Sequence, residues 1–249
     1  MRRNKFLFLF LLCLTFPAGA QFASVPADAR SCALGGVRDY VDATRHVSID
    51  YRHGFMLSEM STRSIEAAFP LGRMGSVVAR YCHFGDHDYA EQQASAGYYM
   101  SLNDWLSMGV AGRYLRLGTS DGHYLPQQWL ALVVAAKAAL SPSLYFTGQT
   151  GTRPWDKERP WQMSLGMGYR PVNHLLALVE VESEDRLRMH FGAEYCYREH
   201  YFLRAGFSTA PLVLSFGVGA RFGNYSIDIA AADYQTLGIT PQISLALWF

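Results

Sequence analysis

The most restrictive feature of this sequence is the alternation of its last eight residues, which ends on an aromatic carboxy-terminus. One side of the alternation is fully apolar and consists of Ile243, Leu245, Leu247 and Phe249, whereas the other consists of Gln242, Ser244, Ala246 and Trp248. A period of two residues is typical of a β-strand with two different faces. A terminal strand of this kind, with Leu245, Leu247 and Phe249 as its signal, is what the assembly machinery of bacterial outer membranes recognises. It makes every weaker alternation upstream a candidate barrel strand.

The other end of the chain has the three parts of a secretory signal peptide. Residues 1–5 are basic, residues 6–16 form an apolar run of 11 residues, and residues 18–20 (Ala-Gly-Ala) supply a small-residue cleavage site. An uncleaved transmembrane anchor needs about 20 apolar residues. We therefore expect residues 1–20 to be removed by cleavage between Ala20 and Gln21 and the rest of the chain to be exported.

The composition favours a barrel over a helical membrane protein. Half of the 249 residues are hydrophobic and 14% are aromatic, yet no run after Phe16 is long and apolar enough for a membrane helix. This predicts an all-β fold, a transmembrane antiparallel β-barrel over residues 47–249. A soluble β-sandwich or a lipocalin-like barrel shares the alternation but explains neither the number of strands nor Phe249. The formal net charge is +1 and no basic tract occurs, so nothing indicates nucleic-acid binding.

Alternating segments predict fourteen strands, with twelve as the main alternative. In residues 161–169, for example, large apolar side chains that would face lipid alternate with Gln, Ser and Gly that would face the lumen. An even number of strands is usual for single-chain bacterial barrels. The predicted strands are residues 47–54, 60–69, 74–84, 88–100, 105–116, 128–139, 143–150, 161–170, 175–183, 186–197, 201–208, 212–222, 224–233 and 241–249.

Turn chemistry and loop length predict the orientation of the barrel. If both termini are periplasmic, the even-numbered strands end in short Pro-, Gly-, Ser- or Asn-containing turns such as residues 70–73 and 141–142. The two longest connections, residues 118–127 and 151–160, then fall on the extracellular side. An aromatic girdle is expected at the periplasmic interface. Its members are Tyr98, Tyr169, Tyr197, Tyr201, Tyr225 and Phe249.

Along each predicted strand, every second residue faces the lumen. This parity places ionisable side chains of both signs inside the barrel. Fourteen strands enclose a lumen wider than an eight-stranded barrel can fill with its own side chains, so these charges pair across the lumen or line water. A partly self-paired, solvated interior is favoured over a selective pore. The predicted lumenal charges are Arg80, Arg113, Lys137, Glu180, Glu182, Arg188, His190, Glu194, Arg221 and Asp228, together with Asp50, Arg52, Glu66 and Glu91.

The sequence predicts no catalytic, cofactor or metal site, and the chain is expected to be non-enzymatic. Its histidines are scattered, and no serine lies in a nucleophile elbow. The turn with His83, Asp86, His87 and Asp88 is interpreted as a solvated polar turn in preference to a metal site. The 151–160 loop presents Trp155, which is expected to be exposed as an anchor for a partner protein or for the membrane interface.

The segment before the barrel, residues 21–46, predicts either a short plug at the periplasmic mouth or a disordered leader. It contains the adjacent glycines Gly35 and Gly36, which allow a tight backbone path. The mature chain has three cysteines, Cys32, Cys82 and Cys196. Cys82 and Cys196 lie at opposite barrel ends and are not expected to pair. Cys32 would reach Cys196 only if the leader folds into the mouth.

Several short motifs are similar to those of the PorV/PorQ-like outer-membrane proteins of Bacteroidota. The family is related to the FadL-type fatty-acid transporters, and the resemblance implies a fourteen-stranded barrel in the outer membrane. The residues that carry it are Ala29–Arg30, Gly35–Gly36, 104–107 (Asp-Trp-Leu-Ser), 221–226 (Arg-Phe-Gly-Asn-Tyr-Ser), Asp233–Tyr234 and Leu237–Gly238.

Three functions remain open at this stage. The first, implied by the resemblance, is an accessory barrel of type IX secretion or related surface export that binds secretion-system proteins through its rims. The second is a FadL-like channel for small hydrophobic compounds, which requires an apolar lumenal pocket and a lateral opening. The third is a structural barrel without transport. Lumenal parity gives mostly charged, Gly and Ser residues, which favours the first. Outer-membrane lipid and the assembly machinery are expected partners in every case.

Overall fold

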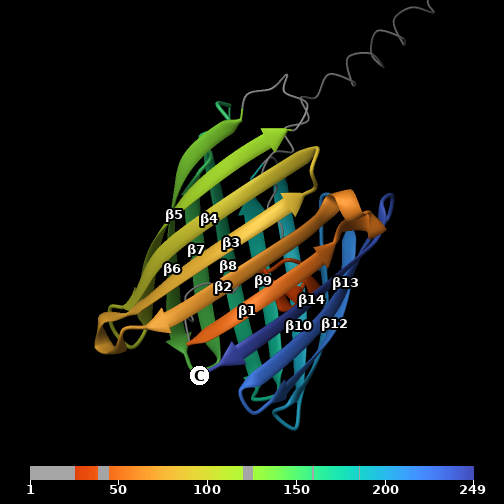
Figure 1. Cartoon of the computed structure of the whole chain (residues 1–249). Coiled ribbons are helices and arrows are strands. Elements are labelled where there is room, and N and C mark those ends of the chain that lie inside the picture. The colour runs from red at the N-terminus through yellow and green to blue at the C-terminus, as the bar shows by residue number, and fades with distance from the viewer. Residues whose placement is uncertain (1–25, 39–44, 120–125, 159, 185) are drawn as a thin grey trace, which may run out of the picture.

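The chain forms a closed antiparallel β-barrel of fourteen strands in the computed structural model (Figure 1). The structure describes residues 26–38, 45–119, 126–158, 160–184 and 186–249. The predicted signal peptide, residues 1–20, lies outside the described residues. The strands are β1 (His46–His53), β2 (Ser61–Pro70), β3 (Ser76–Gly85), β4 (Tyr89–Ser101), β5 (Leu106–Thr119), β6 (Gln127–Ser141), β7 (Leu144–Thr152), β8 (Trp161–Val172), β9 (Leu175–Ser183), β10 (Leu187–Tyr197), β11 (Tyr201–Ser208), β12 (Val213–Phe222), β13 (Tyr225–Tyr234) and β14 (Gly238–Trp248).

The prediction of an all-β barrel with fourteen strands is confirmed, and the alternative of twelve is excluded. Every predicted boundary lies within three residues of the observed one. The largest differences include the start of β14, at Gly238 instead of residue 241. Proline usually marks a strand edge because it lacks the N–H donor, but Pro241 lies within β14, opposite Ala231 of β13.

The terminal strand closes the barrel. β14 pairs with β1 in a continuous antiparallel register from His46 opposite Trp248 to Arg52 opposite Gln242. Each strand therefore has a hydrogen-bonded neighbour on both sides, and the described strands leave no open edge. A membrane-spanning sheet requires this closure because hydrocarbon offers no partner for an edge N–H or C=O.

The two faces of the wall separate as the alternation predicts. Leu165 on β8 and Phe216 on β12 point outward with 69% and 61% of their surface exposed, whereas the adjacent Ser164 and Ser215 are buried on the lumenal face. Large apolar side chains cover the outside of the wall from end to end. A soluble sandwich would place these side chains in its core, so the wall is built to face lipid.

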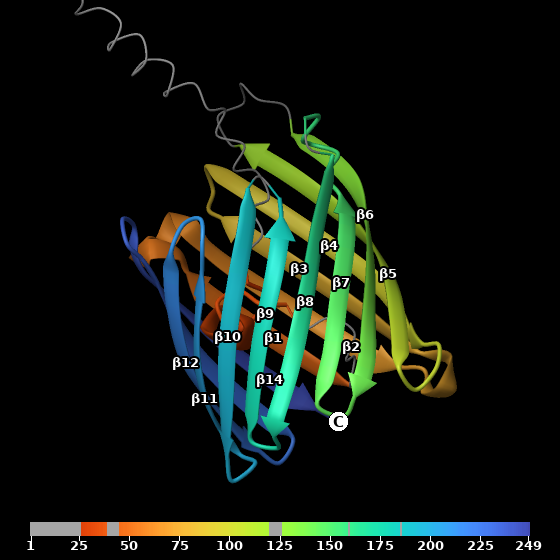
Figure 2. The ribbon, with the colours of Figure 1, turned by 180° about the vertical axis from the view of Figure 1, so that it is seen from behind.

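The two ends of the barrel differ in their connections as predicted for the 151–160 loop, whereas residues 120–125 of the predicted 118–127 loop lie outside the described residues. At the end that carries Phe249, short turns such as residues 102–105 and 223–224 connect the strands; at the opposite end lie the longer β1–β2 and β7–β8 connections (Figures 1 and 2). Tyr169, Tyr197 and Tyr225, each close to that first end, are 46%, 48% and 65% exposed. This arrangement fits a periplasmic Phe249 end with an aromatic girdle.

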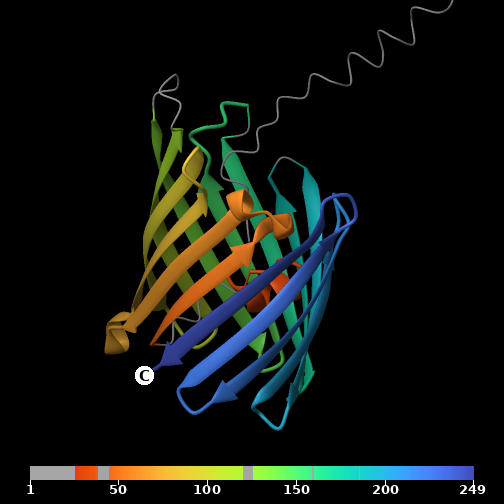
Figure 3. The ribbon, with the colours of Figure 1, turned by 45° about the vertical axis from the view of Figure 1, so that its right-hand side comes forward.

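A short helix, α2 (Ala29–Ala33), lies inside the barrel against β11–β14 (Figure 3). Its neighbours Gly217, Ala230 and Ser244 lie near the middle of β12, β13 and β14. The sequence predicts a plug at the periplasmic mouth, and the described part of the segment, residues 26–38, lies deeper than that. We call residues 26–38 the plug. The alternative of a disordered leader is wrong for these residues, because their contacts with the wall are numerous and specific.

Arginine should be tolerated very differently on the two faces of β4. Ala96 points outward between Ala79 of β3 and Gly112 of β5, whereas Gln93 points into the lumen. Ala96→Arg is expected to lower the free energy of unfolding in phospholipid vesicles by about 2–4 kcal/mol, the cost of arginine near the bilayer midplane. Gln93→Arg, the control, should cost far less. Equal losses in denaturant unfolding would contradict the assignment of the faces.

We propose that Phe249 acts in assembly more than in the stability of the finished barrel. Its side chain is 51% exposed, with the Arg45 guanidinium 5.5 Å from the ring centroid. Since even full burial of such a side chain is worth only about 1.5–3 kcal/mol, deleting Phe249 should leave the folded barrel stable but reduce its amount in the outer membrane. Phe222→Ala, which removes another exposed aromatic ring, is the control. Normal levels of the deletion variant in membrane fractions would contradict a role in recognition.

Candidate functional site

The plug rests on the barrel wall through backbone contacts that only glycine permits. Gly35 and Gly36 have φ angles of +74° and +90°, which favour glycine. A Cβ atom on Gly35 would lie 2.7 Å from the carbonyl oxygens of Phe191 and Phe207, and one on Gly192 would lie 2.7 Å from the Leu34 oxygen. A Cβ on Gly206 would overlap the backbone of Leu34 and Gly35. Glycines on both sides therefore bring the plug into direct contact with β10 and β11.

The start of α2 is held by local and distant hydrogen bonds. Asp28 caps the helix by accepting a hydrogen bond from the Ser31 N–H at 2.6 Å, and the Ser31 hydroxyl lies 3.1 Å from the Asp28 backbone nitrogen, which donates to it. This is a capping box. The Ala29 N–H donates to the hydroxyl of Ser244 on β14 at 2.7 Å. The terminal strand of the barrel thus helps to fix the plug.

A chain of four charged side chains ties the plug to β10, β11 and β13. The Arg30 Nε donates to Glu194 Oε2 at 2.9 Å, and Arg204 Nε donates to the same oxygen at 2.6 Å. Arg204 also donates through Nη1 to Asp228. Sequence reasoning placed Glu194 and Asp228 in the lumen but missed Arg204, which parity within β11 would have found because it lies between the outward Leu203 and Ala205.

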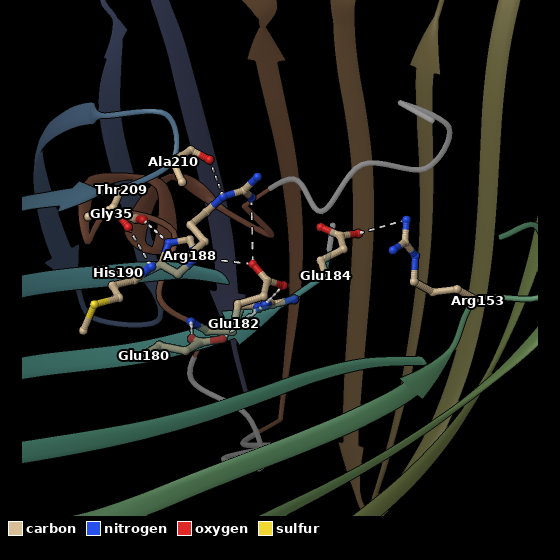
Figure 4. A network of polar contacts seen from close by, with 11 residues as sticks. Gly35, Arg153, Glu180, Glu182, Glu184, Arg188, His190, Thr209 and Ala210 are labelled. Atoms are coloured by element: carbon tan, nitrogen blue, oxygen red, sulfur yellow. Dashed lines mark hydrogen bonds and ion pairs between the residues drawn. The ribbon is translucent and has the colours of Figure 1, made fainter. Parts of the chain in front are cut away.

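A second cluster holds the end of the plug against β9 and β10 (Figure 4). The Arg38 N–H donates to Glu180 Oε2 at 2.7 Å, and the Arg38 guanidinium contacts both Glu180 and Glu182. His190 lies between the plug and the wall, with Nδ1 2.7 Å from the Gly35 oxygen and Nε2 3.3 Å from Glu182 Oε2. Glu180 and Glu182 are each 1% exposed. Buried carboxylates require such partners, since an unpaired buried charge is costly.

Apart from Arg188, the other predicted lumenal charges lie outside these clusters. Arg80 donates to the Ala27 oxygen at 2.6 Å and so contacts the start of the plug. Arg188 reaches Glu182 at 3.9 Å. Lys137 lies over the ring of Tyr145 at 4.6 Å, Arg221 lies 5.3 Å from the ring of Trp248, and Arg113 lines the cavity described next. The lumenal charges therefore form a set of separate contacts, only some of which involve the plug.

A cavity of about 400 Å³ lies between the plug and the wall. Part of its lining is apolar and comes from β5, β6 and β9 together with Leu34 and Val37 of the plug. The apolar wall residues Ala111, Leu115, Val133 and Leu178 are at most 9% exposed. The expectation that the lumen is mostly charged, Gly and Ser is therefore wrong for this region. Ala111 and Leu115 on β5 and Val133 on β6 give the lumenal face apolar positions there, although Arg113 lies between the first two.

The β7–β8 connection covers the cavity at the end opposite Phe249. Arg153 is 2% exposed and forms ion pairs with Asp156 at 3.5 Å and Glu184 at 4.0 Å. Trp155 lines the cavity and lies edge-on to Trp129 at 6.4 Å. Trp155 was expected to be exposed as an anchor for a partner. The structure corrects this, because the buried Arg153 turns the loop inward.

The thiols are free in the described part of the chain. Cys32 is buried in the plug, against Val213, Ala230 and Ala232, while Cys82 lines the cavity and Cys196 lies on β10. Burial raises the pKa of the Cys32 thiol to about 11, which makes it a poor nucleophile near neutral pH. Within the described residues no three His, Cys, Asp or Glu side chains are grouped as metal ligands.

These features define a class: a plugged, fourteen-stranded β-barrel of the outer-membrane type with a lumenal cavity. Its fold is similar to the TodX deltaS2S3 mutant monoaromatic hydrocarbon channel, with a TM-score of 0.66 at 10% identity, covering 90% of this chain and 99% of that one. The CymD monoaromatic hydrocarbon channel is similar with a TM-score of 0.65 at 11% identity, and the match covers 92% of this chain and 99% of that one. The Acinetobacter baumannii outer membrane protein Omp33 is similar with a TM-score of 0.59 at 8% identity, and the match covers 85% of this chain and 100% of that one.

No protein-family model matches the sequence, and no curated protein matches it. At 8–11% identity the likeness to these channels is one of fold. It agrees with the strand count, the closed topology and the outward apolar face derived above.

The plug should detach when its glycine contact is blocked. Gly206→Ala would place a methyl group in the backbone of Gly35, whereas at Gly112, the control position, no atom lies within 4 Å of an added Cβ. If the docking free energy of the plug falls by about 1.4 kcal/mol, the population of the undocked plug rises about tenfold. With Cys82 and Cys196 replaced by serine, Gly206→Ala is therefore expected to speed maleimide labelling of Cys32 at least tenfold. Equal labelling of Gly206→Ala and Gly112→Ala would contradict the docked plug.

Proposed function

We propose that this protein is an outer-membrane channel for small compounds with a substantial apolar part, and that residues 26–38 act as its plug. The observation that carries the proposal is the lumenal cavity, whose Leu115, Val133 and Leu178 wall is bordered by the plug on one side and by Trp155 of the β7–β8 loop on another. A concave site with apolar walls and a few polar groups is typical of small-molecule binding. The likeness in fold to two hydrocarbon channels supports the same class of substrate.

The route would pass along the lumen. The sequence interpretation of a hydrophobic channel requires a lateral opening, but the described strands are hydrogen-bonded to their neighbours around the whole barrel. A compound that enters from the end opposite Phe249 would meet Trp155 and then the cavity. Release toward the Phe249 end would require the ion pairs of Arg30 and Arg38 to rearrange, so the plug would control passage.

The accessory role in surface export stays a hypothesis. It rests on the resemblance to PorV/PorQ-like proteins and on partner binding at the rims. The tryptophan expected to serve as an anchor lines the cavity instead. The channel is therefore the better supported proposal, and a non-enzymatic role fits both.

Filling the cavity should stop uptake. In bacterial cells that produce the chain, uptake of labelled p-xylene is expected to exceed that of cells without it, whereas uptake of a sugar of similar size should not change. Ala111→Trp places a large ring in the cavity, and uptake should fall to the background level. Ala96→Trp, on the outer face of the adjacent strand β4, is the matched control and should keep full uptake. Equal uptake of both p-xylene and p-cresol with and without the chain would overturn the proposal.

A further inference from the structure

Four buried polar groups of the cavity form one continuous patch on β14, β1 and β2. Gln242, Arg52 and Thr62 are direct register partners across these three strands, and Asp50 lies two residues from Arg52 on the same face of β1. All four line the cavity. Gln242, Thr62 and Asp50 are 4%, 7% and 8% exposed. We call these four residues the polar patch.

Each residue of the polar patch has one polar atom without a hydrogen-bond partner in the described part of the chain. These atoms are Gln242 Oε1, Thr62 Oγ1, Arg52 Nε and Asp50 Oδ1. The remaining groups of two of them are engaged: Arg52 Nη2 donates to the Tyr234 hydroxyl at 2.9 Å, and Asp50 Oδ2 accepts from Ser64 Oγ at 3.3 Å. Since buried polar atoms are nearly always paired, four such atoms on one cavity wall point to a bound polar group.

The chemistry of the polar patch selects the kind of group. Gln242 Oε1 and Asp50 Oδ1 accept hydrogen bonds, Arg52 Nε donates, and the Thr62 hydroxyl does both. A carboxylate only accepts, so it would meet two oxygens that it cannot satisfy. A hydroxyl both donates and accepts, and it matches the opposite charges of Asp50 and Arg52. A purely hydrocarbon ligand would leave all four atoms unpaired.

We propose that the polar patch binds the hydroxyl group of a small neutral amphiphile, such as a phenol or an alicyclic alcohol, whose apolar body lies on the Leu115, Val133 and Leu178 wall. This inference rests on the proposed channel function and specifies its substrate class. The cavity of about 400 Å³ is large enough for a single substituted ring.

Three probes with the same ring test the proposal: p-cresol carries a hydroxyl, p-xylene a methyl group and 4-methylbenzoate a carboxylate. Binding to the full chain in detergent micelles is measured by titration calorimetry, with empty micelles as the blank. We expect p-cresol to bind about tenfold more tightly than p-xylene, which corresponds to about 1.4 kcal/mol, and 4-methylbenzoate to bind most weakly.

Thr62→Val combined with Gln242→Met keeps the side-chain size and removes two polar groups. Because Asp50 and Arg52 remain, this variant should lose part of the preference for p-cresol over p-xylene, with p-xylene binding unchanged from the original protein. Ser164→Ala, a buried lumenal change on β8 outside the cavity lining, should keep the preference. Retention of the barrel is checked by its shift in gel mobility on boiling.

The outcomes separate this inference from the proposed function. Equal binding of p-cresol and p-xylene by the original protein would overturn the inference even if the double variant fails to fold, while uptake of p-xylene by cells would still support the channel. A preference of undiminished size in a folded double variant would also overturn the role of the polar patch. Binding of p-cresol at the patch, without chain-dependent uptake of either compound, would support a ligand site and overturn the channel.

Discussion

The whole structure depends on the pairing of β14 with β1. In hydrocarbon an unpaired N–H or C=O costs several kcal/mol, so a sheet that faces lipid must close on itself. The register of β1 against β14 achieves this from His46 to Arg52. Once the sheet is closed, every residue of a strand faces either lipid or lumen. The alternation of large apolar with small or polar side chains is the consequence.

Closure creates a second constraint, because fourteen strands enclose more space than their own side chains fill. The chain fills part of it with residues 26–38. Close contact uses Gly35, Gly192 and Gly206, since any Cβ there would meet backbone atoms. The orientation of the plug within the lumen is set by Arg30 and Arg38, whose carboxylate partners lie on the wall. Buried ion pairs add little net stability because of their desolvation cost, so these pairs define where the plug lies more than how firmly the barrel folds.

The same arrangement explains why the cavity has two kinds of wall. Toward β5, β6 and β9 it is apolar, and the plug presents Leu34 and Val37 to it. Toward β14, β1 and β2 it is polar, with hydrogen-bonding atoms that the plug leaves unpaired. A cavity that joins both surfaces is suited to molecules that are themselves part apolar and part polar. In the proposed channel, the plug and the inward-turned loop at Trp155 would control when such a molecule passes.

The sequence by itself determined the strands, their faces and the orientation of the turns, because each follows from neighbours along the chain. The alternation in residues 161–169 or 241–249 needs no knowledge of the rest of the fold. Only the tertiary structure decided which lumenal groups meet. Arg30 and Glu194 are 164 residues apart, and Arg38 and Glu180 are 142 apart. Their contacts depend on how far the plug enters and on which strands curve around it. The inward turn of Trp155 and the apolar wall at Leu115 follow from the same cause: parity states that a side chain faces the lumen, but the curvature of the closed barrel decides what stands opposite it.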